Sequence, residues 1–200
     1  AFFTYKISPL SDIQLSYSRR ISRPGFRTLA PFFGFSDNRN FYSGNPNVNP
    51  EFTDSYETGY MRYFEKGSLY SGIYYRHRTG VIERITIVEE RNGEEFTRFF
   101  PINLAVQDAY GLEFNLQYKF TKWYDVNANL NLFQAITVGD YEGNNFGAVN
   151  NSSTARLINR FNFWKSDLQI TFNMRGANQS AQTRSLGIYT LDIGWSKDIL

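Results

Sequence analysis

Nine residues at positions 124–132 read Tyr124-Asp125-Val126-Asn127-Ala128-Asn129-Leu130-Asn131-Leu132. Apolar side chains alternate here with aspartate and asparagine, and this period of two is typical of a β-strand, whose side chains point to opposite faces in turn. A helix has 3.6 residues per turn and would not separate the two sets. The stretch therefore predicts a strand with one apolar and one polar face.

The same alternation extends outward from this stretch in both directions. It recurs at 112–120 and 168–174, and further strands are predicted at 2–7, 12–21, 53–65, 69–90, 95–119, 153–165 and 186–197. No convincing helix remains. The chain is therefore predicted to be all-β, with about nine or ten antiparallel strands.

The predicted connections are of two kinds, which alternate along the chain. Short turns are expected at 8–11, 65–67, 121–123 and 165–167, and longer polar loops at 22–51, 139–152 and 177–185, with an Asn92-Gly93 hairpin between the two extended segments 69–90 and 95–119. Bacterial outer-membrane barrels show this asymmetry, because their periplasmic turns are tight and their outer loops long. The pattern favours a transmembrane β-barrel.

The side chains on the two faces favour the same interpretation. Asn, Gln, Ser, Thr and Gly dominate the polar face, as in a polar barrel lumen, and aromatic residues, 18% of the chain, cluster near strand ends. A soluble lipocalin-like barrel with its apolar face inward is the alternative, since alternation alone does not say which face is inside.

Composition and charge exclude several other classes. No window of about 18 apolar residues could form a transmembrane helix. Lys plus Arg number 21 against 19 Asp plus Glu, without a basic block, so no nucleic-acid partner is expected. Cysteine is absent, which excludes disulfides and thiolate sites. The start of the chain lacks the features of a signal peptide, so the chain is expected to be mature or a fragment.

No catalytic constellation is present, and we expect neither enzymatic activity nor a cofactor. His77 is the single histidine and cannot form a common metal site or triad without partners. The loop Gly139–Asn145 places oxygen atoms at alternate positions, but the calcium-binding EF-hand pattern is missing. An exposed turn is the better interpretation of that loop.

Several motifs, taken together and in order, resemble the barrel of TonB-dependent outer-membrane receptors, and more narrowly the outer-membrane β-barrel family of the Bacteroidota. In that family, a strand ending in an arginine-proline signature leads into a long loop that closes on an asparagine-proline stretch. The matching residues here are Arg20, Arg23, Pro24, Gly44, Asn45, Pro46, Asn49, Pro50, Glu51, Glu57, Gly59, Gly111 and Glu113.

The resemblance implies that residues 1–200 are a segment, C-terminal in position, of a larger barrel with about 22 strands. It also implies that 22–51 is a long extracellular loop and that the parent protein takes up a scarce nutrient in the outer membrane of a Gram-negative bacterium. The implied partners are outer-membrane lipid, TonB contacted through N-terminal parts outside this stretch, and a surface lipoprotein or other envelope subunits. The substrate is not implied.

Two alternatives remain open for the functional residues. The asparagine-proline stretch either sets the entry of the next strand, because Pro46 and Pro50 fix the backbone, or contacts a ligand; strand entry is favoured. The best candidates for ligand or partner contacts are loop aromatics, which would otherwise fold back over the barrel mouth: Phe32, Phe33, Phe35, Phe41 and Tyr42.

A barrel that anchors an envelope complex without transporting anything is the second functional hypothesis. A plug domain upstream in the full-length gene favours the transporter, and its absence favours the scaffold.

Overall fold

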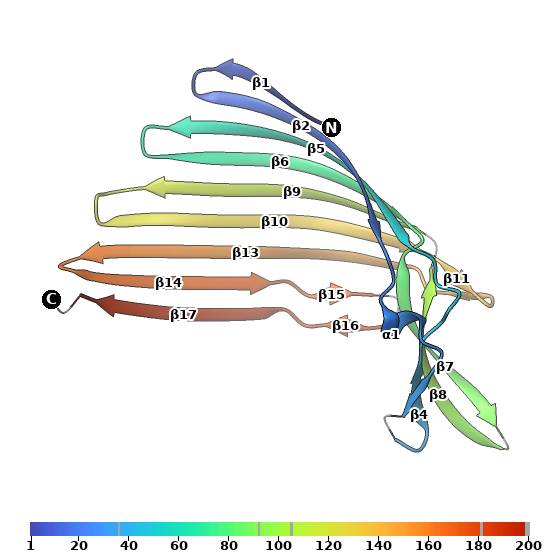
Figure 1. Ribbon diagram of the computed structural model, residues 1–200. Coiled ribbons are helices and arrows are strands. Elements are labelled where there is room, and N and C mark those ends of the chain that lie inside the picture. Colours follow the sequence, from blue (N-terminus) through green and yellow to red (C-terminus); the bar gives the residue numbers. More distant parts are fainter. Residues whose placement is uncertain (36, 92, 105, 181, 199–200) are drawn as a thin grey trace.

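The computed structural model describes residues 1–35, 37–91, 93–104, 106–180 and 182–198. Within them, nine strands form one antiparallel sheet (Figure 1). In spatial order these strands are β1 (Phe2–Ser8), β2 (Ser11–Ser22), β5 (Glu51–Phe64), β6 (Gly67–Thr79), β9 (Val106–Lys119), β10 (Tyr124–Val138), β13 (Ala148–Phe163), β14 (Ser166–Arg175) and β17 (Ile188–Lys197). The predicted all-β class and antiparallel pairing are confirmed.

Connections between neighbouring strands alternate between short and long, as predicted. The short ones span residues 9–10, 65–66, 120–123 and 164–165, and the long ones span 23–50, 80–105, 139–147 and 176–187. Figure 1 shows the short turns together at one end of the sheet and the long connections at the other. We call these the turn end and the loop end.

The polar face of the sheet is the less accessible one. On β9, Tyr110, Leu112 and Phe114 are exposed, whereas the intervening Gly111 and Glu113 are half-buried. In a soluble protein the apolar side chains would be the less accessible ones. The opposite distribution is expected if the polar face lines the concave side of a curved sheet. In water, each exposed leucine or isoleucine on the outward face would cost about 1–2 kcal/mol relative to a buried one. Hydrocarbon around the barrel would remove this cost.

Aromatic rings form a band at each end of the outward face. Near the loop end, the rings of Tyr17, Tyr56, Tyr75 and Tyr110 follow one another with centroid distances of 5.1, 6.0 and 5.1 Å. Near the turn end, the rings of Tyr118, Phe120, Tyr124 and Phe161 follow at 4.9, 5.3 and 4.7 Å.

The spacing of the two bands matches a bilayer. Tyr110 and Tyr118 lie on the same strand, roughly 27 Å apart along it, and a tilt of about 40° reduces this to about 20 Å across a membrane. Transmembrane barrels carry an apolar band about 25 Å tall between aromatic girdles. The distance between the two bands is therefore close to that expected between interfacial girdles.

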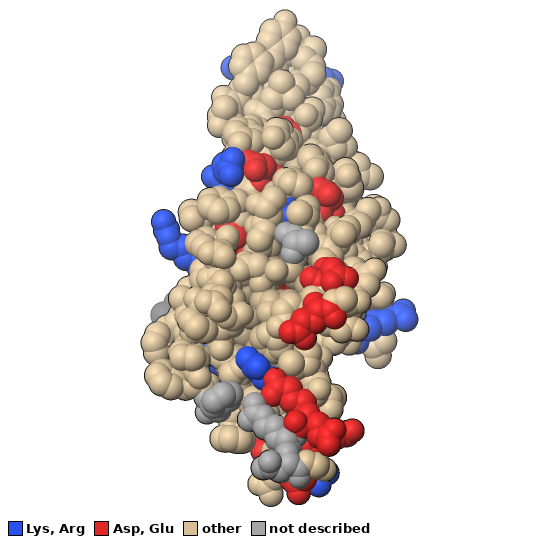
Figure 2. All heavy atoms as spheres, turned by 90° about the vertical axis from the view of Figure 1, so that its right-hand side faces the viewer, with Lys and Arg blue, Asp and Glu red and all other residues tan. Residues whose placement is uncertain are grey.

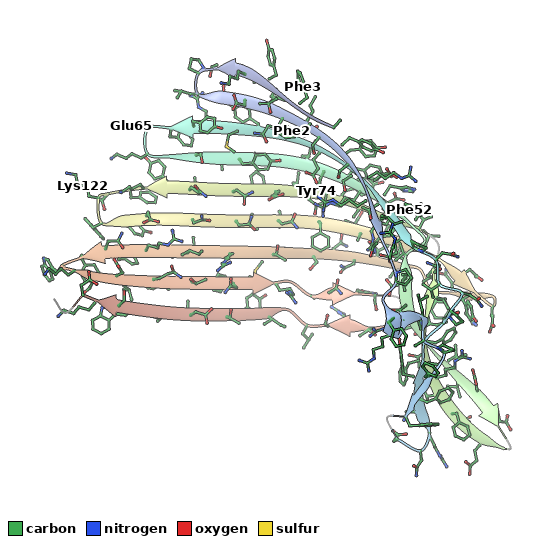
Figure 3. All side chains as sticks on the ribbon, in the orientation of Figure 1. Phe2, Phe3, Phe52, Glu65, Tyr74 and Lys122 are labelled. Atoms are coloured by element: carbon green, nitrogen blue, oxygen red, sulfur yellow. The ribbon has the colours of Figure 1, made fainter. Side chains whose placement is uncertain are left out.

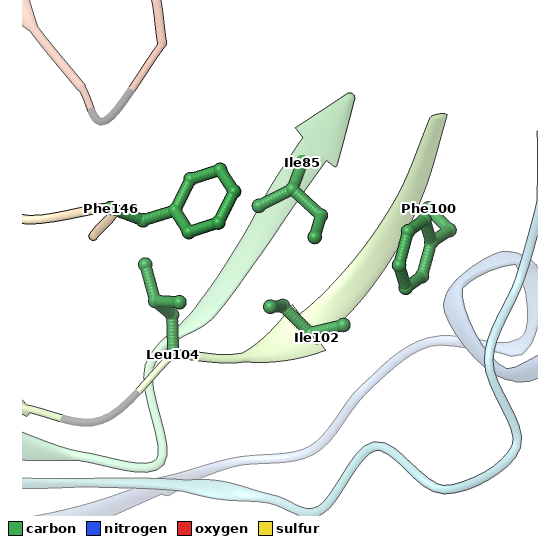
Figure 4. Close-up of a cluster of buried hydrophobic side chains, with 5 residues drawn as sticks. All are labelled: Ile85, Phe100, Ile102, Leu104 and Phe146. Atoms are coloured by element: carbon green, nitrogen blue, oxygen red, sulfur yellow. The ribbon is translucent and has the colours of Figure 1, made fainter. Parts of the chain in front are cut away.

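At the loop end, the long connections form a small cap with its own apolar core. A four-stranded sheet has the order β3 (Phe33–Phe35), β4 (Asn40–Ser43), β8 (Glu94–Asn103) and β7 (Ile82–Arg91), with β4 parallel to β8. A cluster of buried apolar side chains lies against it: Ile85, Phe100, Ile102, Leu104 and Phe146 (Figure 4). The large sheet does not need this core if lipid covers its apolar face.

The remaining elements are short and also belong to the long connections. They are the single-turn helix α1 (Phe26–Leu29) and the two-residue strands β11 (Asp140–Tyr141), β12 (Asn144–Asn145), β15 (Asn178–Gln179) and β16 (Arg184–Ser185). No helix in the described ranges is long and apolar enough to cross a membrane.

Element bounds differ from the predicted ones mainly at the loop end. The predicted strand 69–90 is two strands, β6 and β7, separated by Gly80, whose φ of +67° is in the left-handed region. The predicted strand 95–119 is likewise β8 followed by β9, and β13 begins inside the predicted loop 139–152. Asn92 of the predicted hairpin lies outside the described residues, and Gly93 has a φ of +83°.

Candidate functional site: the polar wall and the loop cap

The asparagine-proline stretch holds the cap together through backbone contacts. A Cβ on Gly44 would overlap the backbone of Ala30, so this approach of two loop segments requires glycine. The Asn45 backbone N–H donates to the Thr28 carbonyl at 2.7 Å, and its side-chain Nδ2 donates to the Pro101 carbonyl at 3.0 Å. Asn45 thereby joins the loop 23–50 to β8.

Asn49 and Asn103 extend this connection toward the large sheet. The Asn49 backbone N–H donates to Asn103 Oδ1 at 2.7 Å, while Asn103 Nδ2 donates to the carbonyls of Asn49 and Gly80 at 3.0 and 2.6 Å. One amide side chain thus satisfies backbone groups of two segments that sheet pairing leaves without partners. Pro50 follows directly, and β5 begins at the next residue.

Glu51 is a buried carboxylate at the junction between the large sheet and the cap. Its side chain accepts the Ile82 backbone N–H at 2.6 Å and the Arg78 guanidinium at 3.1 Å. Arg78 also donates to Gln107 at 2.9 Å. Glu51 therefore ties the start of β5 to the end of β6 and the start of β7, and the motif residues 44–51 make contacts that fix strand entry.

We expect Glu51→Ala to loosen the cap while leaving the large sheet folded. The substitution leaves the Ile82 N–H and the Arg78 guanidinium without their acceptor, a local loss of about 1–3 kcal/mol. Limited proteolysis within residues 80–105 should become several-fold faster. Glu65→Ala in an exposed turn is the control, and equal proteolysis of both variants would contradict the role given to Glu51.

The arginine-proline part of the motif lies at the end of β2 and in the following loop. Arg20 is paired with Thr53 across the strands and is exposed, and Arg23 is exposed as well. Pro24 precedes Gly25, the N-cap residue of α1. The structure therefore places this signature at the loop end, apart from the motif residues of the polar wall.

Glu57, Gly59, Gly111 and Glu113 come together on the polar face of β5 and β9. Two tyrosines of β6 lie flat across the glycines of this face: a Cβ on Gly59 or Gly72 would lie within 3.0 Å of Tyr70, and one on Gly111 would lie within 3.0 Å of Tyr74. Tyrosines packed over glycines compensate for the missing side chains in a sheet. We call this region the polar wall.

Polar contacts hold the Tyr74 ring in place. Its hydroxyl donates to Asn131 Oδ1 at 3.1 Å, and the Arg76 guanidinium lies 4.2 Å from its ring centroid. Arg76 in turn pairs with Glu57 at 3.5 Å. Figure 3 shows Tyr74 on the large sheet, away from the cap. Neither tyrosine nor Arg76 is predicted as a functional residue from the sequence. The usable signal is the glycines at polar-face positions of three adjacent strands, Gly59, Gly72 and Gly111.

The loop aromatics separate into buried and exposed side chains. Phe41 is only 2% exposed, and Tyr42 donates its hydroxyl to the Arg27 carbonyl at 3.0 Å, so both contribute to packing of the cap. Phe32 and Phe35 are 71% and 72% exposed. The side chain of Phe33 lies outside the described ones. Of the five predicted contact residues, Phe32 and Phe35 are therefore the two whose rings are described and available to a partner.

Acidic residues mark the surface at the loop end. Figure 2 shows Asp and Glu along the middle of this face, with Lys and Arg mostly toward its sides. Glu83 of β7 belongs to the cap, and burial, assisted by the charge of Glu51, raises the pKa of its carboxyl above the ordinary value although Arg78 acts in the opposite direction. The carboxyl of Glu83 therefore keeps its proton to a higher pH than an exposed glutamate does.

Cap stability should consequently depend on pH through Glu83. A carboxyl whose folded-state pKa is raised stabilises the fold below its unfolded pKa, and this contribution is lost as pH rises through the folded-state pKa. We expect Glu83→Gln to slow hydrogen exchange of the β7 and β8 amides at about pH 7 and to have no such effect near pH 4. An effect of equal size at both pH values would contradict this assignment.

The other sites weighed from the sequence have ordinary surroundings. His77 Nδ1 lies 2.8 Å from an Asp108 carboxylate oxygen, and no group of three potential metal ligands exists in the described part of the chain. The Gly139–Asn145 loop is a tight turn in which the Gly143 N–H donates to Asp140 at 3.1 Å. A hollow of about 860 Å³ lies beside Tyr56, Tyr75, Tyr110 and Leu132 on the outward face, where lipid would cover it.

Comparisons with known proteins agree with this architecture. The sequence matches the outer membrane protein beta-barrel family over residues 1–200. The fold is similar to the siderophore receptor PirA from Pseudomonas aeruginosa, with a TM-score of 0.70 and 14% identity over 98% of this chain. It is also similar to a mutant of the ferric enterobactin receptor from Pseudomonas aeruginosa (TM-score 0.66, 11% identity) and to the copper transporter OprC (0.66, 12%), each over 100% of this chain.

The chain spans about a third of those structures: 35% of the PirA chain, 32% of the enterobactin receptor and 30% of OprC. No curated protein matches the sequence. At such identities the likeness shows the fold alone, that of part of an outer-membrane β-barrel wall. The structures compared are receptors and a transporter. With the family match over its whole length, the chain belongs to the outer membrane protein beta-barrel family, and the outer membrane is its location.

Proposed function

We propose that this chain forms part of the wall of a TonB-dependent type transporter, which takes up a scarce nutrient across the outer membrane. The observation that carries the proposal is the polar wall: the less accessible face of the sheet is lined by Glu57, Arg76, Glu113 and Asn131, which suit a water-containing lumen. Such a lining leaves the inside of the barrel polar enough for water, a plug or a hydrated solute.

The open sheet supports a larger barrel. Strands β1 and β17 are the sheet's edges, and an unpaired strand edge is not tolerated in hydrocarbon. Further strands of the parent protein would pair with both edges and close a barrel of about 22 strands. The proteins of similar fold are named as siderophore receptors and a copper transporter. A chelated metal is therefore the first substrate to test.

We also infer that the long connections are extracellular, including 22–51, and that the short turns are periplasmic. Partners of the parent protein would then be TonB on the periplasmic side and a surface lipoprotein or other envelope subunits on the outer side. The arginine-proline and asparagine-proline motifs support a member of the Bacteroidota branch of the family.

Deletion of the parent gene tests the transporter. The deletion strain should grow poorly on one limiting nutrient supplied as a large complex, such as chelated iron, and normally on the free nutrient. Complementation should require both the parent gene and TonB. Normal growth of the deletion strain across iron, copper, vitamin and glycan limitation, with the folded barrel verified in the wild-type membrane by its heat-modifiable gel mobility, would contradict transport.

A scaffold barrel is the second candidate, favoured by the exposed rings of Phe32 and Phe35. Exposed rings on an outer loop suit docking of another envelope protein. In that case the double substitution F32S/F35S would remove a co-purifying envelope subunit. If the same substitution lowered uptake without losing a subunit, the rings would instead serve the transporter.

A further inference from the structure

Two arginines on the polar face of neighbouring strands lie beside one hollow. Arg156 is on β13, and Arg175 is on the neighbouring strand β14. The cross-strand partner of Arg175 is Thr154, two residues before Arg156, so the two arginine side chains project from the same face at diagonal positions. They line a hollow of about 440 Å³ with Asn129, Thr154, Asn173 and Thr190. We call this the arginine hollow.

No carboxylate lines the arginine hollow, in contrast to the surroundings of Arg76 and Arg160 on the same face. Arg76 pairs with Glu57 at 3.5 Å, and Arg160, on the same strand and face as Arg156, pairs with Asp125 at 3.5 Å. Within the described residues, neither Arg156 nor Arg175 has an ion pair. The nearby Asp192 of β17 contacts the Asn173 amide at 3.4 Å and is not part of the lining.

The chemistry of this lining suits an oxyanion. Like charges on neighbouring strands repel each other, and this repulsion is relieved by an anion between them. Each guanidinium offers a planar fork of N–H donors that matches a carboxylate or a phosphate in bidentate geometry. The hydroxyls of Thr154 and Thr190, which also line the hollow, supply further hydrogen-bonding groups.

We propose that the arginine hollow binds the carboxylate or phosphate group of a solute inside the barrel. The inference deepens the proposed function and rests on it, because a solute reaches this wall only if it enters the lumen. Arg175 ends β14 at the loop end, so the hollow lies in the half of the wall that an entering solute would meet first. Anionic solutes would thereby be held near the entrance.

The test is equilibrium binding of citrate to the full parent protein in detergent, measured by calorimetry, with inorganic phosphate as a second probe. We expect saturable citrate binding that weakens as salt is added. Arg156→Gln and Arg175→Gln should each weaken citrate binding about tenfold or more, and the double variant should abolish it. Tighter binding of citrate than of phosphate would identify a carboxylate site, and the reverse a phosphate site.

Arg160→Gln is the matched control, since it removes a paired arginine from the same strand and face, and it should change the affinity less than about twofold. Absence of saturable binding, or equal losses in all three single variants, would overturn the proposal. The proposal would also be overturned if the double variant were less stable in the absence of citrate and phosphate but still bound them normally. The two arginines would then serve to pair with an internal carboxylate of the parent protein. If the unsubstituted parent protein takes up its solute but binds no citrate, the hollow alone is overturned. If the unsubstituted parent protein binds citrate but transports nothing, the transporter alone is overturned.

Discussion

Replacing Gly111 with alanine is expected to lower the free energy of unfolding of the barrel by about 2–4 kcal/mol. The added Cβ would lie within 3.0 Å of the Tyr74 ring, which must then move. Overpacking of a fitted site costs about 1–3 kcal/mol, and displacing Tyr74 also removes its hydrogen bond to Asn131, worth about 1 kcal/mol. Urea unfolding of the parent protein in lipid vesicles, followed by tryptophan fluorescence, measures the loss.

Two further variants separate this steric effect from a general cost of alanine in a strand. Gly34 lies in strand β3 of the cap, and a Cβ added to it would have no neighbour within 4 Å, so Gly34→Ala should change the stability by less than about 0.5 kcal/mol. In a Tyr74→Ala background, Gly111→Ala should lose most of its effect, because contacting residues are not additive. A full effect of Gly111→Ala without Tyr74 would refute the packing of that ring over the glycine.

Leu130→Lys is expected to destabilise the barrel in a bilayer by about 2–4 kcal/mol. Leu130 is on the outward face, opposite Phe114 on β9 and Ala155 on β13, between the two aromatic bands. A lysine there would bring its charge into hydrocarbon near the middle of the membrane. Urea unfolding in vesicles gives the size of the effect.

Asn127→Lys is the matched control, because the Asn127 side chain points to the polar face of the same strand, between Gln117 and Ile158. It should cost less than about 1 kcal/mol, since a lumen-facing lysine keeps its hydration. If both substitutions cost the same, the two faces would not differ in their surroundings, and the orientation of the sheet in the membrane would be wrong.

Local alternation was enough to predict the large sheet, because each strand carries its own period of two. The turn at 164–165 and the other short connections follow from the breaks in that pattern. The pattern could not show that β6 ends at Thr79, since alternation continues through Gly80 into β7. That break depends on Asn103, far along the chain, which donates to the Gly80 carbonyl.

The cap was predicted least well, for the same physical reason. The parallel pairing of β4 with β8 joins segments that are more than 50 residues apart. Local sequence patterns do not predict such long-range contacts. The buried position of Phe41 follows from that pairing, so the sequence could only group it with the exposed Phe32 and Phe35. The motif residues were found by resemblance, but their contacts, such as that of Glu51 with Ile82, needed the fold.

The central claim is that the apolar face of the large sheet meets lipid and the polar face meets water. The chain has no cysteine, so single cysteines can be placed in it one at a time and spin-labelled in the parent protein in vesicles. Along residues 126–132, labels at even positions should collide with dissolved oxygen and labels at odd positions with a water-soluble nickel complex. Uniform access of the nickel complex to both sets, or the opposite alternation, would contradict the claim.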